Sequence, residues 1–358
     1  MKALANVVEP NLKKSIVDLG LVDNIRVEGN NIFFRVKVSN PAMHGRKRMA
    51  EACEFAIQRV LGGEFKVEAE VVPISPDEAS EDTRRILPGV KYIVAVASGK
   101  GGVGKSTVAV NLAAGLAQLG HSVGLVDADI YGPSAPTMLD LVNEKPVTTK
   151  VEDKEYIKPL EAYGVKVLSI GFFTDGDQAV VWRGPMASKA LNQLFNDAWW
   201  GKLDYMIIDL PPGTGDIHLS LVQNIPLTGA IIVSTPQEVA LADARKGVAM
   251  FTLPSVNVPV LGLIENMAWF SPDGNPENKH YIFGREGTRN LAERLKVPFL
   301  GEIPLIQGIR EAGDVGRPSA LQQGTMAAEV WSEIIHTFVE RVNGAKTSVP
   351  AGISPASN

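Results

Sequence analysis

The stretch from Ser98 to Thr107, which reads SGKGGVGKST, decides the fold of this chain. It contains the pattern GxxxxGK[ST], a glycine-rich loop whose backbone N–H groups surround the phosphates of a nucleotide. The apolar run from Tyr92 to Ala97 precedes the loop, and a helical pattern follows it as far as Gly120. Because such a loop works between a strand and a helix N-terminus, these flanks favour a phosphate site over a turn without a ligand.

Each residue type in the loop has a chemical reason. Glycines let the backbone approach phosphate oxygens closely, and the following helix adds its positive end. Lys105 is expected to bridge the β- and γ-phosphates of ATP, and the Ser106 hydroxyl to bind Mg²⁺. The residues predicted to bind the nucleotide in this segment are Gly99, Gly101, Gly102, Val103, Gly104, Lys105, Ser106 and Thr107.

Two further segments place aspartates at the ends of apolar strands. Val123–Asp129 reads VGLVDAD, and Met206–Asp216 reads MIIDLPPGTGD. Ligands of open α/β sheets bind at the carboxyl ends of the strands, so these carboxylates are candidates for a metal site. Asp209, directly after its strand, is the natural partner of the metal ion, through a water molecule. For Asp127, Asp129 and Asp209 the alternative is a helix or turn cap.

From Lys91 onward, continuous apolar runs alternate with helical segments, and a helix from about Thr325 to Val342 closes the pattern. Apolar runs without polar alternation are typical of strands covered on both faces, and helices between them are typical of crossovers in a parallel sheet. The sequence therefore predicts an α/β domain with a doubly wound, mostly parallel sheet. The predicted strands are Tyr92–Ala97, Val123–Val126, Val165–Ile170, Met206–Leu210, Ala230–Val233 and Val260–Ile264.

The chain divides into four parts. Residues 1–74 are predicted to form a small α+β domain, in which Leu12–Leu19 is expected to be helical. The segment 75–90 begins with a polar stretch without periodicity and is the predicted linker. Residues 91–343 form the predicted nucleotide-binding domain, and residues 344–358 are expected to be a mobile tail.

Composition narrows the classes of partner. The chain has 358 residues and a formal net charge of −5, so it has no broad basic field for nucleic acid. No apolar run approaches the length that spans a bilayer, and no membrane partner is expected. The single cysteine excludes an intrachain disulfide. We therefore expect a cytoplasmic protein.

The loop contains one lysine, Lys100, more than the phosphate pattern requires. A cation from a partner molecule can neutralise the charge that develops on a transferred phosphoryl group. The stretch GKGGVGKST resembles the deviant Walker A motif of the P-loop class that includes the nitrogenase iron protein, MinD and ParA. In that class the first lysine reaches the nucleotide of the partner subunit. The resemblance therefore implies a nucleotide-bridged homodimer in which Lys100 and Lys105 are catalytic.

Further motifs narrow the resemblance. They are DADIYGPSAP at 127–136, WRGPMASKALNQL at 182–194, LDYMIIDLPPGTGD at 203–216, STPQEVALADARKG at 234–247, ENM at 265–267 and GEIPLIQGIREAGDVGRP at 301–318. Together they resemble the Mrp/ApbC family of iron-sulfur cluster carrier ATPases, and residues 1–74 resemble the SufT/PaaD-type domain. The resemblance implies hydrolysis of Mg-ATP in iron-sulfur cluster assembly, with client or scaffold proteins as partners. It also implies that Asp129 orients the attacking water, that Asp127 and Asp209 serve the Mg²⁺ shell, and that Asn266 hydrogen-bonds the adenine.

The chain departs from this family at the cluster site. Carriers of the family usually hold a cluster with a Cys-x-x-Cys pair shortly after the ENM motif, because iron-sulfur clusters need thiolates. The segment Ala268–Tyr281 contains no cysteine. Cys53 falls at helical spacing with Met49 and Ile57, which predicts a thiol on the buried face of a helix. Cluster ligation by Cys53 is the alternative.

Two functions remain in competition. The first is an Mg-ATP-hydrolysing homodimer that acts in iron-sulfur cluster assembly or transfer. The second is a nucleotide-gated switch of the MinD or ParA kind that binds a protein and carries no cluster, and the missing cysteines favour it. A P-loop transferase would need a second substrate pocket, to which no segment points. His218 lies near the expected γ-phosphate, and a helix-surface residue is the alternative to a functional one.

Overall fold

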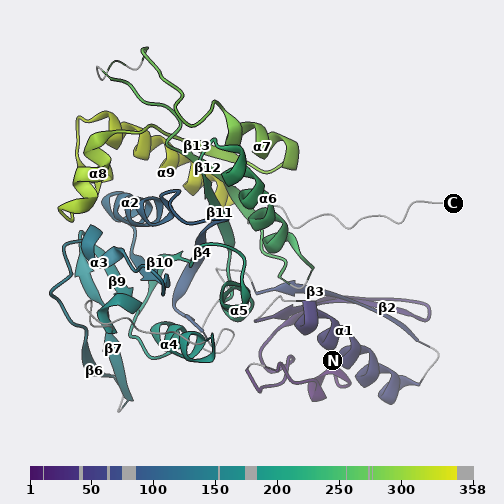
Figure 1. The fold of residues 1–358 in the computed structure, drawn as a ribbon. Helices are drawn as coiled ribbons and strands as arrows, with labels where there is room; N and C mark the ends of the chain where they lie inside the picture. Colours follow the sequence, from purple (N-terminus) through teal and green to yellow (C-terminus); the bar gives the residue numbers. More distant parts are fainter. Residues whose placement is uncertain are drawn as a thin grey trace.

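The computed structural model describes residues 1–10, 12–39, 43–62, 65–74, 86–151, 154–173, 184–254, 256–272, 275 and 277–344. Most of the predicted linker and nearly all of the predicted tail lie outside the described residues. Within them, hydrophobic side chains form two separate cores, one between Ala3 and Ile74 and the other between Leu87 and Val342. Figure 1 draws the unit that contains the first core in purple.

The N-terminal unit is a three-stranded sheet with a helix on one face. β1 (Val22–Glu28) pairs antiparallel with β2 (Asn31–Val38), and β2 pairs parallel with β3 (Lys66–Pro73). Alternate side chains of β2 are buried in a core shared with α1 (Met43–Leu61). A strand that buries every second side chain covers one face of its sheet, so the other face stays open. A short 3-10 helix, η1 (Leu4–Asn6), precedes the sheet.

The segment 12–19, predicted to be helical, forms turns instead. The Glu9 carboxylate accepts a hydrogen bond from the Leu12 N–H at 2.8 Å, and Lys13 has a left-handed backbone with φ 54°. A left-handed residue interrupts a helix, and the Ile16 N–H donates to the Val7 carbonyl at 2.9 Å instead of to a carbonyl one helical turn earlier. The helical prediction was wrong because apolar spacing does not reveal these local bonds.

The large unit contains an eight-stranded sheet in which every neighbouring pair is parallel except the edge pair β8 and β9. This confirms the predicted doubly wound α/β fold. The central strands are buried along almost their whole length, as expected where helices cover both faces. In spatial order the strands are β13 (Phe299–Ile303), β12 (Val260–Asn266), β11 (Gly229–Ser234), β4 (Val90–Ser98), β10 (Leu203–Asp209), β5 (Val123–Asp127), β9 (Val165–Ser169) and β8 (Leu160–Ala162).

All six predicted strands are present in this sheet, and the structure adds β13 and β8 to them. It also adds a hairpin of β6 (Val147–Val151) and β7 (Lys154–Lys158), which the sequence did not predict. Both strands of the hairpin carry mostly exposed or half-buried side chains. Because they bury so little, they lack the apolar pattern by which the other strands were recognised.

The helices pack against the sheet and against one another (Figure 1). α2 contacts β5, β10 and α9, whereas α6 contacts β11. No helix among the described residues combines the length and the apolar character needed to cross a bilayer. The helices of this unit are α2 (Lys105–Gln118), α3 (Ala135–Met138), α4 (Gly184–Asn196), α5 (Asp216–Asn224), α6 (Glu238–Thr252), α7 (Gly287–Leu295), α8 (Gln307–Asp314) and α9 (Met326–Gly344), with the 3-10 helices η3 (Ile170–Phe173) and η4 (Ser319–Leu321).

The strand order brings the predicted site residues together. β4 lies between β10 and β11, and β5 follows on the far side of β10. Because parallel strands end at the same edge of a sheet, the loop after β4 meets the aspartates that end β5 and β10. Asp209 lies opposite Asp127 in the register of these two strands.

Candidate functional site

The loop between β4 and α2 presents backbone N–H groups at a helix N-terminus. Gly104 is the N-cap of α2 with φ 85°, a left-handed conformation that glycine adopts without strain. No side chain of a described residue caps this helix end. The first N–H groups of a helix have no partner within the helix, so here they are open to an anion, which the helix dipole also attracts.

Two glycines of the loop are needed for different reasons. A Cβ at Gly99 would lie 2.2 Å from the carbonyl carbon of Asp243 in α6, so the packing of α6 requires glycine there. A Cβ at Gly101 would meet no atom within 4 Å, and its backbone is not left-handed. The fold itself therefore does not require glycine at position 101, whereas the close approach of a phosphate would.

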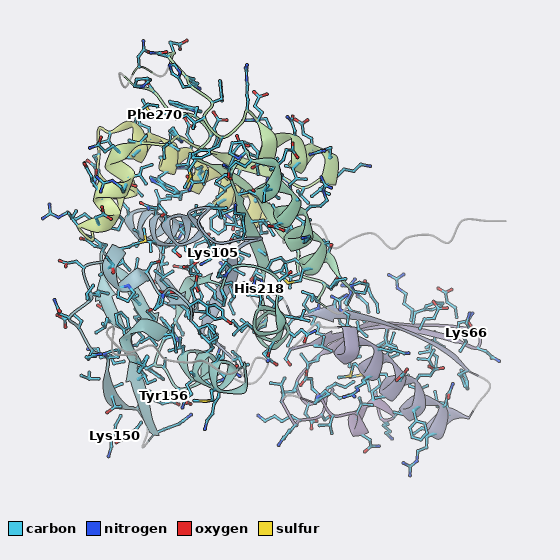
Figure 2. All side chains as sticks on the ribbon, viewed as in Figure 1. Lys66, Lys105, Lys150, Tyr156, His218 and Phe270 are labelled. Atoms are coloured by element: carbon cyan, nitrogen blue, oxygen red, sulfur yellow. The ribbon has the colours of Figure 1, made fainter. Side chains whose placement is uncertain are left out.

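Lys105 is buried at the centre of the site, where Figure 2 labels it. Its Nζ lies 2.6 Å from Asp209 Oδ1, 3.3 Å from Asp129 Oδ2 and 3.3 Å from Ser106 Oγ. Burial disfavours the ammonium charge, but the carboxylates of Asp209 and Asp129 outweigh it and raise the pKa of Lys105. The site thus holds a fixed positive charge beside the open helix N-terminus.

Asp127 is fully buried at the end of β5. Its Oδ1 accepts a hydrogen bond from the Asp129 N–H at 3.2 Å, and its Oδ2 accepts from the Ala135 N–H and the Ser169 hydroxyl at 3.1 and 2.9 Å. Burial and the negative charge of Asp209 raise the pKa of Asp127 to about 7 despite these bonds. Asp127 therefore also caps the turn after β5, the alternative role that the sequence left open.

The residues at this edge fit a magnesium ion. Asp209 Oδ2 is buried and has no hydrogen-bond partner among the described residues, and the Ser106 hydroxyl lies beside the same lysine. Carboxylate and hydroxyl oxygens are ligands that Mg²⁺ takes together with phosphates and water. Among the described residues no group of three or more His, Cys, Asp or Glu side chains could hold a metal by itself. A magnesium ion at this site would therefore depend on the phosphates of the nucleotide.

Lys100 lies in a different environment from Lys105. It is half-buried near the start of the loop, and its carbonyl accepts a hydrogen bond from the Ser98 hydroxyl at 2.9 Å. Its ammonium forms no ion pair with any residue in the described part of the chain. The action of Lys100 on a partner's nucleotide stays a prediction.

Comparison with known proteins identifies the family. A family model described as NUBPL iron-transfer P-loop NTPase matches residues 89–340, and one described as iron-sulfur cluster assembly protein matches residues 1–71. The chain belongs to this iron-transfer P-loop NTPase family. It is 44% identical over 328 residues to the iron-sulfur cluster carrier protein of Synechocystis, with 92% of each chain covered. These findings confirm the resemblance predicted from the motifs.

Other members and solved structures agree. The chain is 50% identical over 242 residues to the iron-sulfur cluster transfer protein NUBPL of Dictyostelium discoideum. The aligned region covers 67% of this chain and 73% of that protein. A nucleotide-binding protein of Archaeoglobus fulgidus in complex with ADP aligns with a TM-score of 0.58 and 35% identity over 69% of this chain and 93% of that one. MinD of Pyrococcus furiosus, with 22% identity and a TM-score of 0.50, shares the fold. The chain is thus a nucleotide-binding P-loop NTPase.

Asn266, which the family resemblance assigns to the adenine, contacts the P-loop of this NTPase. It ends β12, and its Nδ2 donates to the Val103 carbonyl at 2.8 Å. Its Oδ1 accepts from the Met267 N–H at 2.9 Å. The structure thus brings Asn266 to the loop, and its contact with adenine stays a prediction.

His218 of this NTPase is buried. The helix-surface position, which the sequence analysis named as the alternative to a functional role, is therefore wrong. His218 is 2% exposed on α5, and its Nδ1 lies 3.2 Å from the Pro211 carbonyl (Figure 2). Nδ1 therefore carries the proton, and the buried Nε2 has no partner in the part of the chain that the structure describes. The imidazole connects α5 to the turn that follows Asp209. No periodic pattern around His218 indicates this burial.

The segment after the ENM motif, where the family usually has its cysteine pair, packs around Trp269 in this NTPase. Phe270 and His280 form a β-bridge, Lys279 lies 4.4 Å from the ring centre of Trp269, and the Trp269 Nε1 donates to Glu302 at 3.2 Å. Cys53 is fully buried in α1, and burial raises its pKa to about 12, which confirms the predicted core position. A buried thiol with a raised pKa is a poor source of the thiolate that iron requires.

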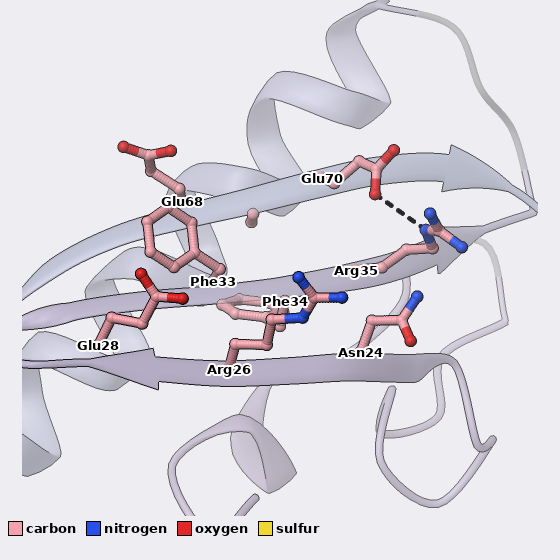
Figure 3. Close-up of a pocket in the computed structure, with 9 residues that line it drawn as sticks. Asn24, Arg26, Glu28, Phe33, Phe34, Arg35, Glu68 and Glu70 are labelled. Carbon is pink, nitrogen blue, oxygen red and sulfur yellow. Dashed lines mark hydrogen bonds and ion pairs between the residues drawn. The ribbon is translucent and has the colours of Figure 1, made fainter. Parts of the chain in front are cut away.

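The N-terminal unit of the NTPase has a shallow hollow on the open face of its sheet (Figure 3). The volume of the hollow is about 710 Å³, and both positively and negatively charged side chains line it. Arg35 Nε lies 2.9 Å from Glu70 Oε2, and β1 contributes Arg26 and Glu28. None of its lining residues belongs to the P-loop or to the aspartate-bearing strands. It is therefore separate from the nucleotide site.

Proposed function

We propose that this chain is an Mg-ATP-hydrolysing homodimer that acts in the assembly or transfer of iron-sulfur clusters. The observation that supports it most is the Lys105 ammonium, held by Asp209 and Asp129 at the open N-terminus of α2. Relatives named as cluster carrier or transfer proteins support the biological role. Client or scaffold proteins are the expected partners, and the cytoplasm is the expected location.

Nucleotide binding replaces one set of negative charges around Lys105 by another. The backbone N–H groups of the loop and α2 bind the phosphates, and the lysine exchanges Asp209 and Asp129 for phosphate oxygens. Ser106 and Asp209, with Asp127 behind them, would hold a magnesium ion, which would supply Lewis-acid neutralisation of the phosphates. Release of the lysine leaves the Asp209 carboxylate free for that role.

Hydrolysis needs an oriented water and a second cation. Asp129 follows β5 at the edge of the site, 8% exposed, with Oδ1 accepting from the Tyr131 N–H at 3.2 Å. This position suits a carboxylate that orients water toward the terminal phosphate. Lys100, which forms no ion pair with a described residue of its own subunit, neutralises the developing charge at the partner's nucleotide. Hydrolysis removes that bridge and lets the dimer open.

The chain's own residues do not fit an iron-sulfur cluster. Clusters are held by thiolates, and the only thiol of the chain, Cys53, is buried in the N-terminal core. We therefore assign the thiolates to the client or scaffold protein. The second candidate, a nucleotide-gated switch that carries no cluster, is supported by the same buried thiol.

The first experiment measures phosphate release by the wild type and by Lys100→Ala, with the dimer followed by light scattering on a sizing column. Lys100→Ala is expected to bind ATP normally and to lose roughly 10²-fold or more in hydrolysis rate. Lys202→Ala, at an exposed lysine outside the loop, is the matched control and should behave as the wild type. A hydrolysis rate that Lys100→Ala leaves unchanged would contradict the proposed dimeric mechanism.

A further inference from the structure

We propose that Asn266 is a positioning residue that sets the shape of the phosphate loop, in addition to any contact with a base. This inference rests on the proposed nucleotide-binding function and deepens it. Asn266 is 8% exposed and lies on β12, which β11 separates from the strand that leads into the loop. Its amide nevertheless reaches the loop carbonyl of Val103.

The orientation of the Asn266 amide is fixed from both sides. Its oxygen accepts the Met267 N–H at 2.9 Å, so its nitrogen is the atom that faces Val103. Met267 has a left-handed φ of 56°, and the next N–H, that of Ala268, donates to the Ile303 carbonyl at 3.0 Å on β13. The backbone after Asn266 is therefore anchored to the sheet, which gives its amide a fixed base.

The loop is shaped to receive this amide. A Cβ at Gly104 would lie 2.0 Å from Asn266 Nδ2, so glycine at this position leaves the space that the amide occupies. The same glycine has the left-handed backbone that starts α2. Gly104 thus meets two requirements at once, one of backbone conformation and one of contact with β12.

The hydrogen bond fixes the direction of the next N–H. In a planar trans peptide the C=O and the N–H point in opposite directions. Since the Val103 carbonyl points to Asn266, the N–H of Gly104 points away from Asn266, and we assign it to the phosphate cradle. Loss of the Asn266 donor leaves a buried carbonyl without a partner, which favours rotation of this peptide and misdirection of its N–H.

The inference differs from base recognition in a measurable way. An amide nitrogen has two N–H groups, and only one is used by Val103. Substitution of a residue that contacts only adenine lowers the affinity for ligands with a base. Substitution of a residue that shapes the loop also lowers the affinity for a phosphate chain without a base. A comparison of the affinities for Mg-ATP and for magnesium tripolyphosphate therefore distinguishes the two roles.

The experiment compares Asn266→Ala and Asn266→Asp with the wild type by calorimetric titration and by hydrogen exchange of the loop peptide without nucleotide. Asn266→Asp keeps an oxygen toward Met267 but replaces the donor by a negatively charged oxygen, whereas Asn266→Ala removes the donor without adding a charge, so Asn266→Ala decides the comparison of affinities. Thr228→Val is the matched control, because Thr228 Oγ1 accepts the Ile93 N–H at 3.0 Å toward the opposite end of β4. We expect the affinity of Asn266→Ala for magnesium tripolyphosphate to fall by a factor of roughly 5 to 10, and its affinity for Mg-ATP to fall by at least that factor.

Loop amides are also expected to exchange faster in both Asn266 variants and at the wild-type rate in Thr228→Val. Unchanged loop exchange, with a loss of affinity confined to ATP, would overturn the inference and leave an adenine contact only. If the wild type binds neither ligand, the proposed function fails, and loop exchange alone still decides the role of Asn266.

Discussion

At the level of single residues, Lys105 neutralises a group of buried carboxylates. Its Nζ contacts Asp209 and Asp129, which are both buried. Removal of one partner of a buried ion pair leaves an uncompensated charge and costs about 3 to 5 kcal/mol. We predict that Lys105→Ala lowers the free energy of unfolding of the nucleotide-free protein by about this amount at pH 8, as measured by urea denaturation.

The control for this prediction lies in the same loop. Lys100 forms no ion pair with a described residue, so Lys100→Ala should change the free energy of unfolding by less than about 0.5 kcal/mol. The loss caused by Lys105→Ala should shrink at pH 5, because protonation of nearby carboxyl groups reduces the unpaired charge. Equal losses for the two variants would contradict the predicted role of Lys105.

His218 makes stability depend on pH. Burial lowers its pKa from 6.5 to about 4. The unfolded chain takes up a proton near pH 6.5, whereas the folded protein does not do so until about pH 4, so acid favours unfolding. The contribution of neutral His218 is therefore fully present above about pH 6.5 and is lost as the pH falls toward 4, with a total on the order of 3 kcal/mol.

The test is the difference in Tm between the wild type and His218→Gln across this pH range. Glutamine keeps an N–H donor for the Pro211 carbonyl and has no proton to take up. We predict that the wild type loses stability relative to His218→Gln between pH 7.5 and pH 5. A difference in Tm that stays constant with pH would show that His218 does not titrate as its burial implies.

At the level of secondary-structure elements, the loop glycines separate packing from ligand binding. A methyl group at Gly99 would overlap the backbone of α6 at Asp243, whereas one at Gly101 would meet open space. We predict that Gly99→Ala lowers the free energy of unfolding by about 1 to 3 kcal/mol, since overpacking forces the helix to move. Thermal unfolding without nucleotide measures this loss.

Gly101→Ala is the matched variant. Its free energy of unfolding should stay within about 0.5 kcal/mol of the wild type, because nothing in the described fold opposes the methyl group. Its affinity for Mg-ATP should nevertheless fall, since the methyl group occupies space beside the phosphates. A stable Gly101→Ala protein with unchanged ATP affinity would mean that phosphates do not approach this side of the loop.

At the level of the whole molecule, the only thiol lies in the N-terminal core, whereas the phosphate site lies in the other unit. Burial raises the pKa of Cys53 to about 12. We predict that anaerobic reconstitution with iron and sulfide leaves no stoichiometric cluster on the wild type, as measured by bound iron, acid-labile sulfide and the visible spectrum. Cys53→Ser should behave identically, and a cluster that this substitution removes would make the N-terminal unit a cluster site.

Much of the fold follows from local patterns. The six predicted strands and the last helix are present because they bury apolar side chains continuously or at helical spacing. The segment 12–19 is different, since Lys13 has a left-handed backbone and the Ile16 N–H donates to the Val7 carbonyl rather than within a helix. The hairpin of β6 and β7 was missed because its exposed strands carry little apolar pattern.

By itself the sequence determined the phosphate loop, the parallel α/β sheet and the family, because glycine chemistry, apolar period and motif spacing lie in contiguous residues. Only the tertiary structure decided that Lys105 binds Asp209 and that Asn266 holds Val103, since these partners are 104 and 163 residues apart in the chain. It also decided that His218 is buried. Such contacts depend on the order in which strands align in the sheet, and no local pattern encodes that order.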